Sequence, residues 1–157
     1  MLRQFLFAAV ISACTIVIHA LVMTVVIRAS QATAEKAVSL PNLLLIAVMV
    51  ATVSVLMAAH AGEVFVWSLA YRLVGAAPAD TNFLYFAFVN YTTLGYGDVL
   101  PVDRWRLLGP ITAMNGVLLF GWSTAVIFEV LRKAMAIKAS VDNSPSSARE
   151  LTQSGRL

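Results

Sequence analysis

The chain alternates between three long apolar runs and short polar segments. The first run, residues 5–27, contains 23 residues without an Asp, Glu, Lys or Arg. As a helix it is about 34 Å long, which is enough to cross the roughly 30 Å hydrocarbon layer of a membrane. The second run, residues 42–73, follows Pro41, a residue type that fits the first turn of a helix, and the third covers residues 105–133. We therefore predict an all-α membrane protein with three transmembrane helices.

The polar segments define the rest of the organisation. Residues 1–28 form the predicted N-terminal transmembrane helix, residues 29–41 a connecting loop, and residues 134–157 a polar tail. Within the tail, Ser147 and Glu150 have the spacing of a capping box for one short helix. A cleaved signal peptide is the alternative for the first run, but the apolar region of such a peptide is usually about 7–15 residues long. The greater length of the run favours a membrane helix.

A half-length apolar segment lies between the second and third runs. The sequence from Gly75 to Pro78 breaks the preceding helix, and Asp80 or Thr81 is positioned to cap a new one. The predicted helix over residues 81–92 is too short to cross the membrane, and an irregular stretch follows it. Non-helical backbone at membrane depth is tolerated only where protein buries it or where it lines a water-filled cavity. This arrangement predicts a re-entrant loop.

The composition agrees with a membrane domain and limits the kinds of partner that we expect for it. Of the 157 residues, 60% are hydrophobic and 12% are charged, and the mean hydropathy is +0.83, whereas soluble domains are about half apolar and a quarter charged. The net charge of +3 comes without a basic block interleaved with aromatic residues, so we expect contacts with membrane lipid and no nucleic acid partner. Cys14 is the one cysteine, which excludes an intrachain disulfide.

The irregular stretch, residues 93–97, has a backbone suited to binding a cation. In an ordinary strand successive carbonyls point in opposite directions, so alternate residues must adopt left-handed torsions if all the carbonyls are to face one axis. Gly95 and Gly97 adopt such torsions without a Cβ penalty. The resulting ladder of oxygen ligands for a hard cation consists of the carbonyls of Thr93, Leu94, Gly95 and Tyr96 and the hydroxyl of Thr93. The Leu94 and Tyr96 side chains would then point outward and wedge the ladder in place.

Residues 92–98, TTLGYGD, resemble the signature sequence of potassium channels, whose filter is the TVGYG loop. The departure is Leu94 in place of valine, which changes a side chain and not the carbonyl ladder. The resemblance extends over residues 42–133 and implies that the second run is an outer helix, the half-length segment a pore helix, residues 93–97 the filter, and the third run an inner helix. It also implies a homotetramer that conducts potassium ions passively through a central pore, and not an enzyme. Because one chain carries one loop, a ring of four loops requires four copies.

The resemblance also implies supporting roles around the filter. The residues concerned are Thr92, Gly97, Asp98, Tyr85 and Phe86. Tyr85 and Phe86 lie where such channels place an aromatic cuff, in which a tryptophan often bonds the aspartate after the filter. Phe86 has no donor for Asp98, so the partner of that carboxylate stays open. Val89 occupies a position that is acidic in some relatives and apolar in others.

His60 and Glu63 are ionisable residues inside the second run, spaced by three positions so that they share a helix face. Such residues are costly in a membrane and commonly functional. Counting 1.5 Å per residue from Asn42 places them about 27–32 Å along the helix, level with the filter, either as a brace behind it or as a pair that snorkels to the headgroups. A metal site would need more ligands than we expect at that level. By the same counting, His19 falls near the cytosolic side and is predicted to be a packing residue, not their partner.

The third run carries further candidates. Gly116 and Gly121 are either hinges or points of close helix packing. Glu129 continues a stripe with the 3.6-residue period of a helix face. By analogy with the channels that the chain resembles, this stripe faces the pore, and four carboxylates would form a ring at the cytosolic mouth that binds magnesium or polyamines. The alternative is an ordinary surface pair of Glu129 with Arg132 and Lys133.

The resemblance implies a topology as well. Both pore-module helices would end in the cytosol, which places the loop over residues 29–41 and the tail inside and the N-terminus outside. The expected location is the cell membrane, as a multi-pass protein of a prokaryotic plasma or inner membrane.

Three rival functions remain in view. Two are close to the first: a weakly selective cation channel and a nonconducting channel-like subunit. The third is an intramembrane serine protease in which Ser123 is the nucleophile and His60 the base. We expect Ser123 in the cytosolic half of the third run and His60 near the outer face, a mismatch in depth that argues against the protease.

Overall fold

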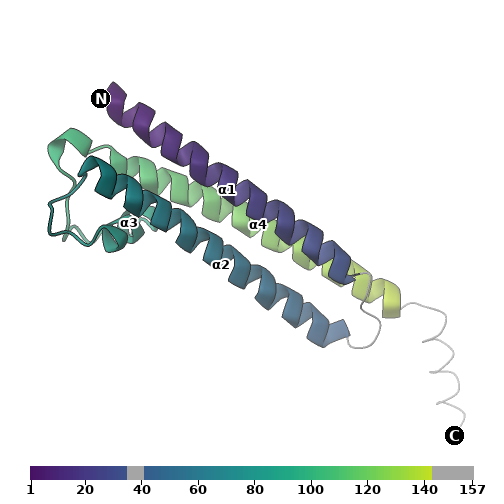
Figure 1. Cartoon of the computed structure of the whole chain (residues 1–157). Coiled ribbons are helices and arrows are strands. Elements are labelled where there is room, and N and C mark those ends of the chain that lie inside the picture. The colour runs from purple at the N-terminus through teal and green to yellow at the C-terminus, as the bar shows by residue number, and fades with distance from the viewer. Residues whose placement is uncertain (35–40, 143–157) are drawn as a thin grey trace, which may run out of the picture.

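A computed structural model describes residues 1–34 and 41–142 of the chain as a bundle of three long helices with a short helix at one end (Figure 1). The helices are α1 (Leu2–Ala34), α2 (Pro41–Val74), α3 (Phe83–Tyr91) and α4 (Leu108–Asp142), with a 3₁₀ turn η1 (Asp103–Trp105) before the last. No strand occurs within these described ranges. The chain runs toward the α3 end along α2 and away from it along α1 and α4.

Three helices are long and apolar enough to cross a membrane, over Leu2–Ala29, Leu45–Val74 and Asp103–Ala136. This confirms the predicted all-α fold with three spans. The helices extend further than the sequence pattern indicated: α1 continues through Arg28 to Ala34, and α4 continues to Asp142. Parts of the segments predicted as loop and tail are therefore helical. The predicted capping box at residues 147–150 lies outside the described residues.

The helix break at Gly75 is confirmed and has a specific geometry. The backbone N–H of Gly75 donates to the Arg72 carbonyl at 3.3 Å, and that of Ala76 donates to the Tyr71 carbonyl at 2.9 Å. These two bonds, with Gly75 at φ +60°, form a Schellman motif that satisfies the last carbonyls of α2. The carbonyl of Ala76 in turn accepts the N–H of Val102 at 2.9 Å, which ties this turn to the segment that leads into α4.

The cap of α3 is Asn82, so the expectation of Asp80 or Thr81 was wrong. The Asn82 side-chain oxygen accepts the N–H groups of Leu84 and Tyr85, each at 3.1 Å. Thr81 instead belongs to the preceding turn, in which its N–H donates to the Pro78 carbonyl at 3.0 Å. The helix therefore begins two residues later than predicted, and α3 is only nine residues long.

Two apolar clusters hold the bundle together. Near the α3 end, Trp67, Tyr71, Phe86, Tyr91 and Leu108 are all buried, and the Tyr71 and Phe86 ring centroids are 5.0 Å apart. A second cluster lies further along the bundle and consists of Met23, Val26, Leu56, Val126 and Val130. Between the two clusters each long helix contributes polar residues. Apolar side chains are as favourably placed in lipid as in protein. Close packing and interhelical hydrogen bonds therefore hold such helices together.

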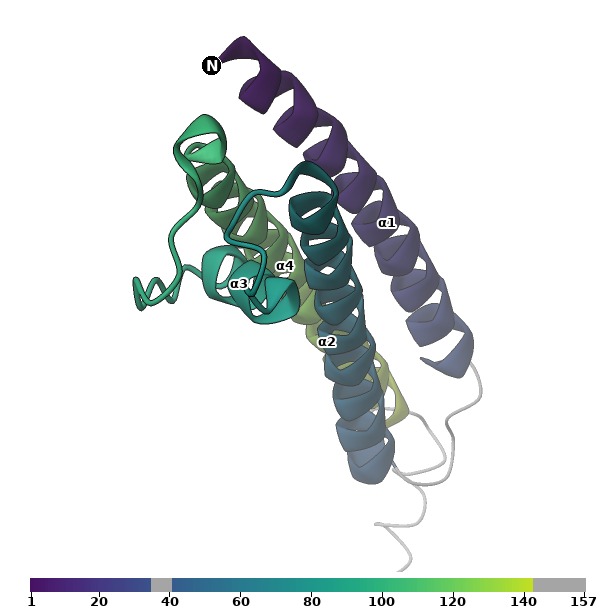
Figure 2. The same ribbon diagram turned by 60° about the vertical axis from the view of Figure 1, so that its left-hand side comes forward.

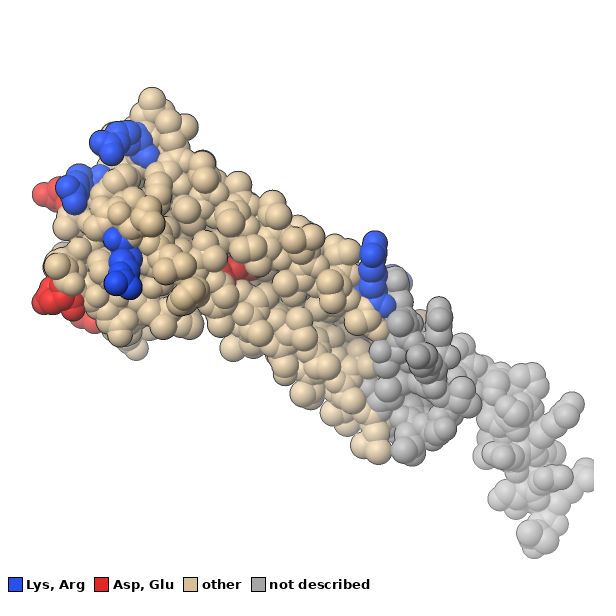
Figure 3. Space-filling model, viewed as in Figure 1, with Lys and Arg blue, Asp and Glu red and all other residues tan. Residues whose placement is uncertain are grey.

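Helices α1 and α3 lie on different sides of the α2–α4 pair (Figure 2), and both contact α2 and α4. On the face that Figure 3 shows, charged side chains gather at the α3 end, and the surface along the helices is almost free of charge up to a basic side chain toward the other end. The α3 end carries exposed charges of both signs, among them Arg3, Arg72, Asp80, Asp98 and Arg104. This distribution suits a bundle whose middle lies in lipid and whose ends meet water.

Candidate functional site

The loop after α3 has left-handed backbone at every second residue. Thr93, Gly95 and Gly97 have φ values of +60°, +58° and +76°. The prediction that Gly95 and Gly97 adopt such torsions is confirmed, and Thr93 joins them although it carries a Cβ. A β-branched residue in this region is strained by about 1–3 kcal/mol and commonly marks a functional site. The alternation turns successive carbonyls of the loop away from the zigzag of an ordinary strand.

The amide groups at the start of this loop are used to close α3. The N–H groups of Thr92, Thr93 and Leu94 donate to the carbonyls of Phe88, Asn90 and Val89 at 3.0, 3.1 and 3.0 Å. Within the described parts of the chain, no backbone hydrogen bond outside the helices ends on a carbonyl of residues 93–97. The oxygens of the loop are therefore free to serve as ligands. Val89 has no acidic side chain, and its backbone carbonyl accepts the N–H of Leu94.

The loop projects from the bundle of a single chain (Figure 2). The side chains of Leu94 and Tyr96 are 51% and 69% exposed, although both are large and apolar. Exposed apolar groups next to a strained backbone are typical of a surface that contacts other protein or lipid.

Asp98 has a partner that the sequence did not identify. The Tyr85 hydroxyl donates to Asp98 Oδ2 at 2.8 Å, and this hydrogen bond raises the pKa of Tyr85. Phe86 is buried against Tyr71 instead of facing the loop. Of the two aromatic residues, Tyr85 therefore reaches the end of the loop after α3, and Phe86 packs α3 against α2.

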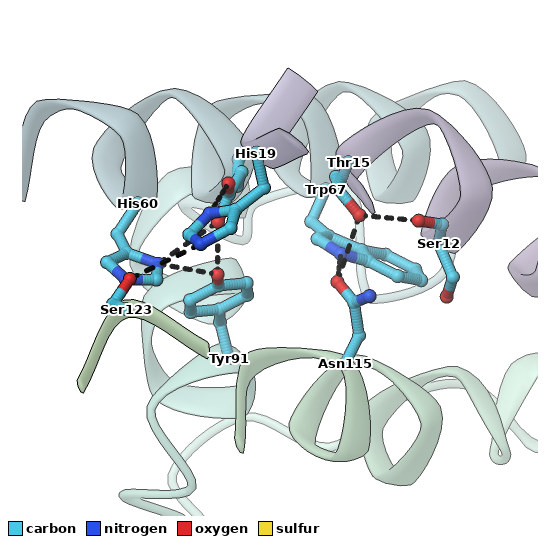
Figure 4. A network of polar contacts seen from close by, with 9 residues as sticks. Ser12, Thr15, His19, His60, Trp67, Tyr91, Asn115 and Ser123 are labelled. Carbon is cyan, nitrogen blue, oxygen red and sulfur yellow. Dashed lines mark hydrogen bonds and ion pairs between the residues drawn. The ribbon is translucent and has the colours of Figure 1, made fainter. Parts of the chain in front are cut away.

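A buried polar cluster lies behind the end of α3 (Figure 4). Its centre is Glu63, whose side chain is 0% exposed. His19 Nδ1 lies 2.7 Å from Glu63 Oε1, and His60 Nδ1 lies 3.1 Å from Oε2. The Tyr91 hydroxyl donates to Glu63 Oε2 and lies 2.9 Å from His60 Nδ1. Glu63 is thus held by residues from three helices and does not snorkel to a helix end.

The expectation that His19 is not a partner of Glu63 was wrong, and helix length explains the error. Depth was counted on the assumption that the first span ends near residue 28. Because α1 continues to Ala34, His19 lies near the middle of its helix, where it contacts Glu63, about two-thirds of the way along the antiparallel α2. The same correction removes the argument that a metal site lacks ligands, because three ligand residues meet at this level.

Ser123 also belongs to this cluster, so the predicted mismatch in depth with His60 was wrong. Its Oγ lies 2.9 Å from His60 Nε2 and 3.3 Å from His19 Nε2. With α4 continuing to Asp142, Ser123 is a mid-helix residue like His60. The Ser123–His60–Glu63 contacts resemble those of a hydrolytic triad. However, Ser123 is buried inside a helix and faces a second imidazole, which leaves its hydroxyl no approach for a carbonyl substrate.

A second set of polar contacts binds α1 to the rest of the bundle. The Asn115 side-chain oxygen accepts from the Thr15 hydroxyl at 3.0 Å and from the Trp67 indole at 3.1 Å (Figure 4). At the end of the bundle, the Gln4 side-chain oxygen accepts the N–H of Leu107 at 2.9 Å, just before α4 begins. Helix α1 is therefore attached to the other helices at three levels.

The two glycines of α4 differ in their surroundings. A Cβ added to Gly116 would lie 2.1 Å from the Tyr91 carbonyl oxygen, whereas nothing lies within 4 Å of a Cβ added to Gly121. Gly116 therefore permits the close approach of α4 to the end of α3, which is a packing role. The surroundings of Gly121 require no glycine.

Glu129 pairs with two cations of its own helix. Its carboxylate accepts two hydrogen bonds from Arg132, each at 2.9 Å, and lies 3.2 Å from Lys133 Nζ. Within one chain the surface-pair alternative thus describes its contacts. The ring of carboxylates concerns four chains and stays a prediction.

Comparison with known proteins identifies one family. A family model described as "ion channel", the two-transmembrane potassium channel pore module, matches residues 43–133. The match begins near the start of α2 and ends within α4, and so includes α3 and the loop with alternating torsions. Searches of curated proteins and of solved structures gave no match.

Proposed function

Because residues 43–133 place this chain in the ion channel family of two-transmembrane pore modules, we propose that it is a potassium-selective channel in which four copies surround one pore. The observation that carries the proposal is the left-handed backbone at Thr93, Gly95 and Gly97. Alternating torsions of this kind align carbonyl oxygens along one axis, and four such loops replace the hydration shell of a potassium ion.

The proposed ligands are the backbone carbonyls of residues 93–96, with the Thr93 hydroxyl at the inner end. Their support comes from two features. The first amides of the loop donate to carbonyls of α3, and Asp98, which directly follows the loop, accepts a hydrogen bond from Tyr85. A preorganised oxygen cage of this kind conducts ions and performs no covalent chemistry.

The exposed apolar surface supports assembly as a homotetramer. Leu94 and Tyr96 on the loop and Met114, Val117 and Leu118 on α4 are all more than half exposed in the single chain. In the proposed tetramer these side chains lie against neighbouring copies or line the pore, and the outer faces of α1 and α2 contact lipid.

The arrangement of the chain supports a topology. The N-terminus and the filter loop lie at one end of the bundle, and α4 ends at the other (Figure 1). If the filter faces the outside, as in the channels that the chain resembles, the N-terminus is outside and the C-terminal end is in the cytosol of a cell-membrane protein. Glu129, in the cytosolic half of α4, would then lie where magnesium or polyamines block the pore.

Ion-replacement flux in liposomes tests the function. Purified chains are reconstituted, and potassium, rubidium and sodium fluxes are compared. We expect potassium and rubidium to permeate and sodium to be excluded. Comparable sodium and potassium fluxes would establish the weakly selective alternative, and no flux from intact tetramers would establish a nonconducting subunit.

A matched pair of glycine variants links the flux to the loop. Gly95→Ala forces a Cβ into a left-handed residue at φ +58°, which costs about 1–2 kcal/mol. Gly62→Ala in α2 adds a Cβ with nothing within 4 Å and serves as the control. We expect selectivity to fall in the first variant and to remain in the second.

A further inference from the structure

We propose that His19, His60 and Glu63 form a binding site for a divalent transition metal ion of the zinc type, inside the helix bundle. Two imidazoles and a carboxylate are a ligand set that zinc uses in proteins. One ligand atom from each of the three residues lies within 4.8 Å of the others, and all three residues are buried. The site joins α1 to α2, and thus joins a helix outside the matched pore module to one within it.

The geometry is close to that of a metal centre. Zinc binds nitrogen and carboxylate oxygen at about 2.0–2.2 Å, so tetrahedral ligand atoms lie roughly 3.3 Å apart. The present separations are 2.7 Å from His19 Nδ1 to Glu63 Oε1 and 3.1 Å from His60 Nδ1 to Oε2. These two pairs open by about 0.2–0.6 Å to admit the ion, and the three ligand atoms, which lie within 4.8 Å of one another, converge on it.

The hydrogen bonds around the site favour an added positive charge. If both imidazoles are neutral and donate to Glu63 through Nδ1, both Nε2 atoms are acceptors. Both Nε2 atoms face the Ser123 hydroxyl, at 2.9 and 3.3 Å, and its single proton serves only one of them. Glu63 also carries a negative charge that is fully buried, and such a charge needs a partner of opposite sign.

A metal ion on the two Nδ1 atoms resolves both problems. Each imidazole then carries its proton on Nε2, and both protons point at Ser123 Oγ, whose two lone pairs accept them. Metal-bound histidines are commonly fixed through the other ring nitrogen in this way. Ser123 is accordingly the outer partner of both ligands, from a third helix.

Tyr91 supplies the fourth position as a neutral hydroxyl, whose oxygen faces the ion while its proton stays in the hydrogen bond to Glu63 Oε2. Its hydroxyl contacts Glu63 Oε2 and lies 2.9 Å from His60 Nδ1, so it faces the same point as the other ligands. Because Tyr91 is the last residue of α3, a metal with these four ligands ties α1 and α2 to the residue that precedes Thr92 and the filter loop. A closed site of four protein ligands is typical of structural rather than catalytic zinc.

The first test measures metal on the wild-type protein. The untagged full-length chain in detergent is stripped with a chelator and titrated with Zn²⁺, and the zinc-bound protein is studied by X-ray absorption at the zinc edge. The chain has only two histidines, so two imidazoles per zinc identify this site. We expect one zinc per chain with two imidazole ligands and oxygen. Absence of binding, or a shell of oxygen ligands alone, overturns the proposal.

The second test compares two variants, each of which removes one side-chain hydroxyl from α4. Ser123→Ala removes the outer partner of both histidines, and we expect zinc affinity to fall about 10–100-fold. Thr124→Ala is the matched control, because the neighbouring hydroxyl bonds only to the Phe120 carbonyl of its own helix in the contacts described. Equal affinity of the two variants, both checked for assembly by size exclusion, contradicts the proposed ligand arrangement.

The metal site and the proposed potassium selectivity fail independently. Zinc binding is measured without ion flux, so a selective channel that binds no zinc refutes the site alone. Zinc binding by a protein with equal sodium and potassium fluxes refutes the selectivity alone.

Discussion

Replacing Gly116 by alanine should drive the inner helix away from the end of the pore helix. The added Cβ would lie 2.1 Å from the Tyr91 carbonyl oxygen and 3.0 Å from its carbonyl carbon. Both are backbone atoms, so no change of rotamer relieves the clash. For the Cβ–oxygen distance to rise from 2.1 Å to the 3.0 Å that real contacts require, α3 or α4 must move by about 0.9 Å.

The cost of this movement follows from two opposing effects. Overpacking a close contact costs about 1–3 kcal/mol, and a contact between backbones belongs at the upper end of that range. Alanine in place of glycine favours a helix by about 1 kcal/mol. We therefore expect a net destabilisation of about 1–2 kcal/mol per chain. Because Tyr91 directly precedes Thr92 and the filter, the shift should also reduce the preference for potassium over sodium.

Thermal dissociation of the purified assembly and the reversal potential under mixed potassium and sodium measure these two effects. Gly121→Ala is the matched control, because it is the same substitution on the same helix with nothing within 4 Å of the new Cβ. It should be neutral or stabilising. If Gly116→Ala matches Gly121→Ala in both stability and selectivity, the contact with Tyr91 does not have the role assigned to it.

Three further substitutions test the filter and the pore mouth. Tyr85→Phe removes the hydroxyl that donates to Asp98, so selectivity should fall. Because the pKa of Tyr85 is raised, the hydrogen bond is fully formed below the ordinary tyrosine pKa and is lost as the pH rises through the raised value. Wild-type selectivity of Tyr85→Phe at neutral pH would show that the hydrogen bond does not support the filter. Tyr96→Ala should weaken assembly or selectivity, because its 69% exposed ring needs a neighbouring chain, and unchanged dissociation and reversal potential would exclude this. Glu129→Gln should lower conductance and weaken magnesium block at low salt, with the difference shrinking as salt screens the charge. Equal conductance at low salt would leave Glu129 as a surface pair with Arg132 and Lys133.

Features that depend on local sequence were predictable. Apolar runs of sufficient length indicated three spans, and the small residues around Gly75 indicated the end of α2. The torsions of Gly95 and Gly97 followed from the requirement that carbonyls face one axis. Each of these depends on a few neighbouring residues, whose conformational limits are set by the chain itself.

The cap of α3 and the partner of Asp98 were harder to predict from the sequence. Asp80, Thr81 and Asn82 are all suitable caps in succession, and the choice among them depends on the turn that Thr81 makes with Pro78. Tyr85 is 13 positions before Asp98, and only the path of the loop brings them together. Local propensity does not contain this information.

The polar cluster was missed because depth was counted from the wrong helix ends. The apolar pattern of α1 stops near residue 28, yet the helix continues to Ala34, and this difference displaces the apparent level of His19 by about two turns. The same holds for Ser123 in α4. A usable signal was present: polar residues in the middle of apolar runs, here His19, Asn115 and Ser123, need partners at their own depth.

Hydrogen bonds join α1 to the helices of the matched pore module. It lies outside the matched residues 43–133, yet Gln4, Thr15 and His19 bond to the pore module at three successive levels. Interhelical hydrogen bonds in membranes average about 0.6 kcal/mol each, so the three together contribute roughly 2 kcal/mol. His19 matters more than this average, because withdrawing it deprives the buried Glu63 carboxylate of a hydrogen-bond partner, and a hydrogen bond to a charged group contributes about 1.5–3 kcal/mol. Helix α1 therefore helps to hold Glu63 in place behind the end of α3.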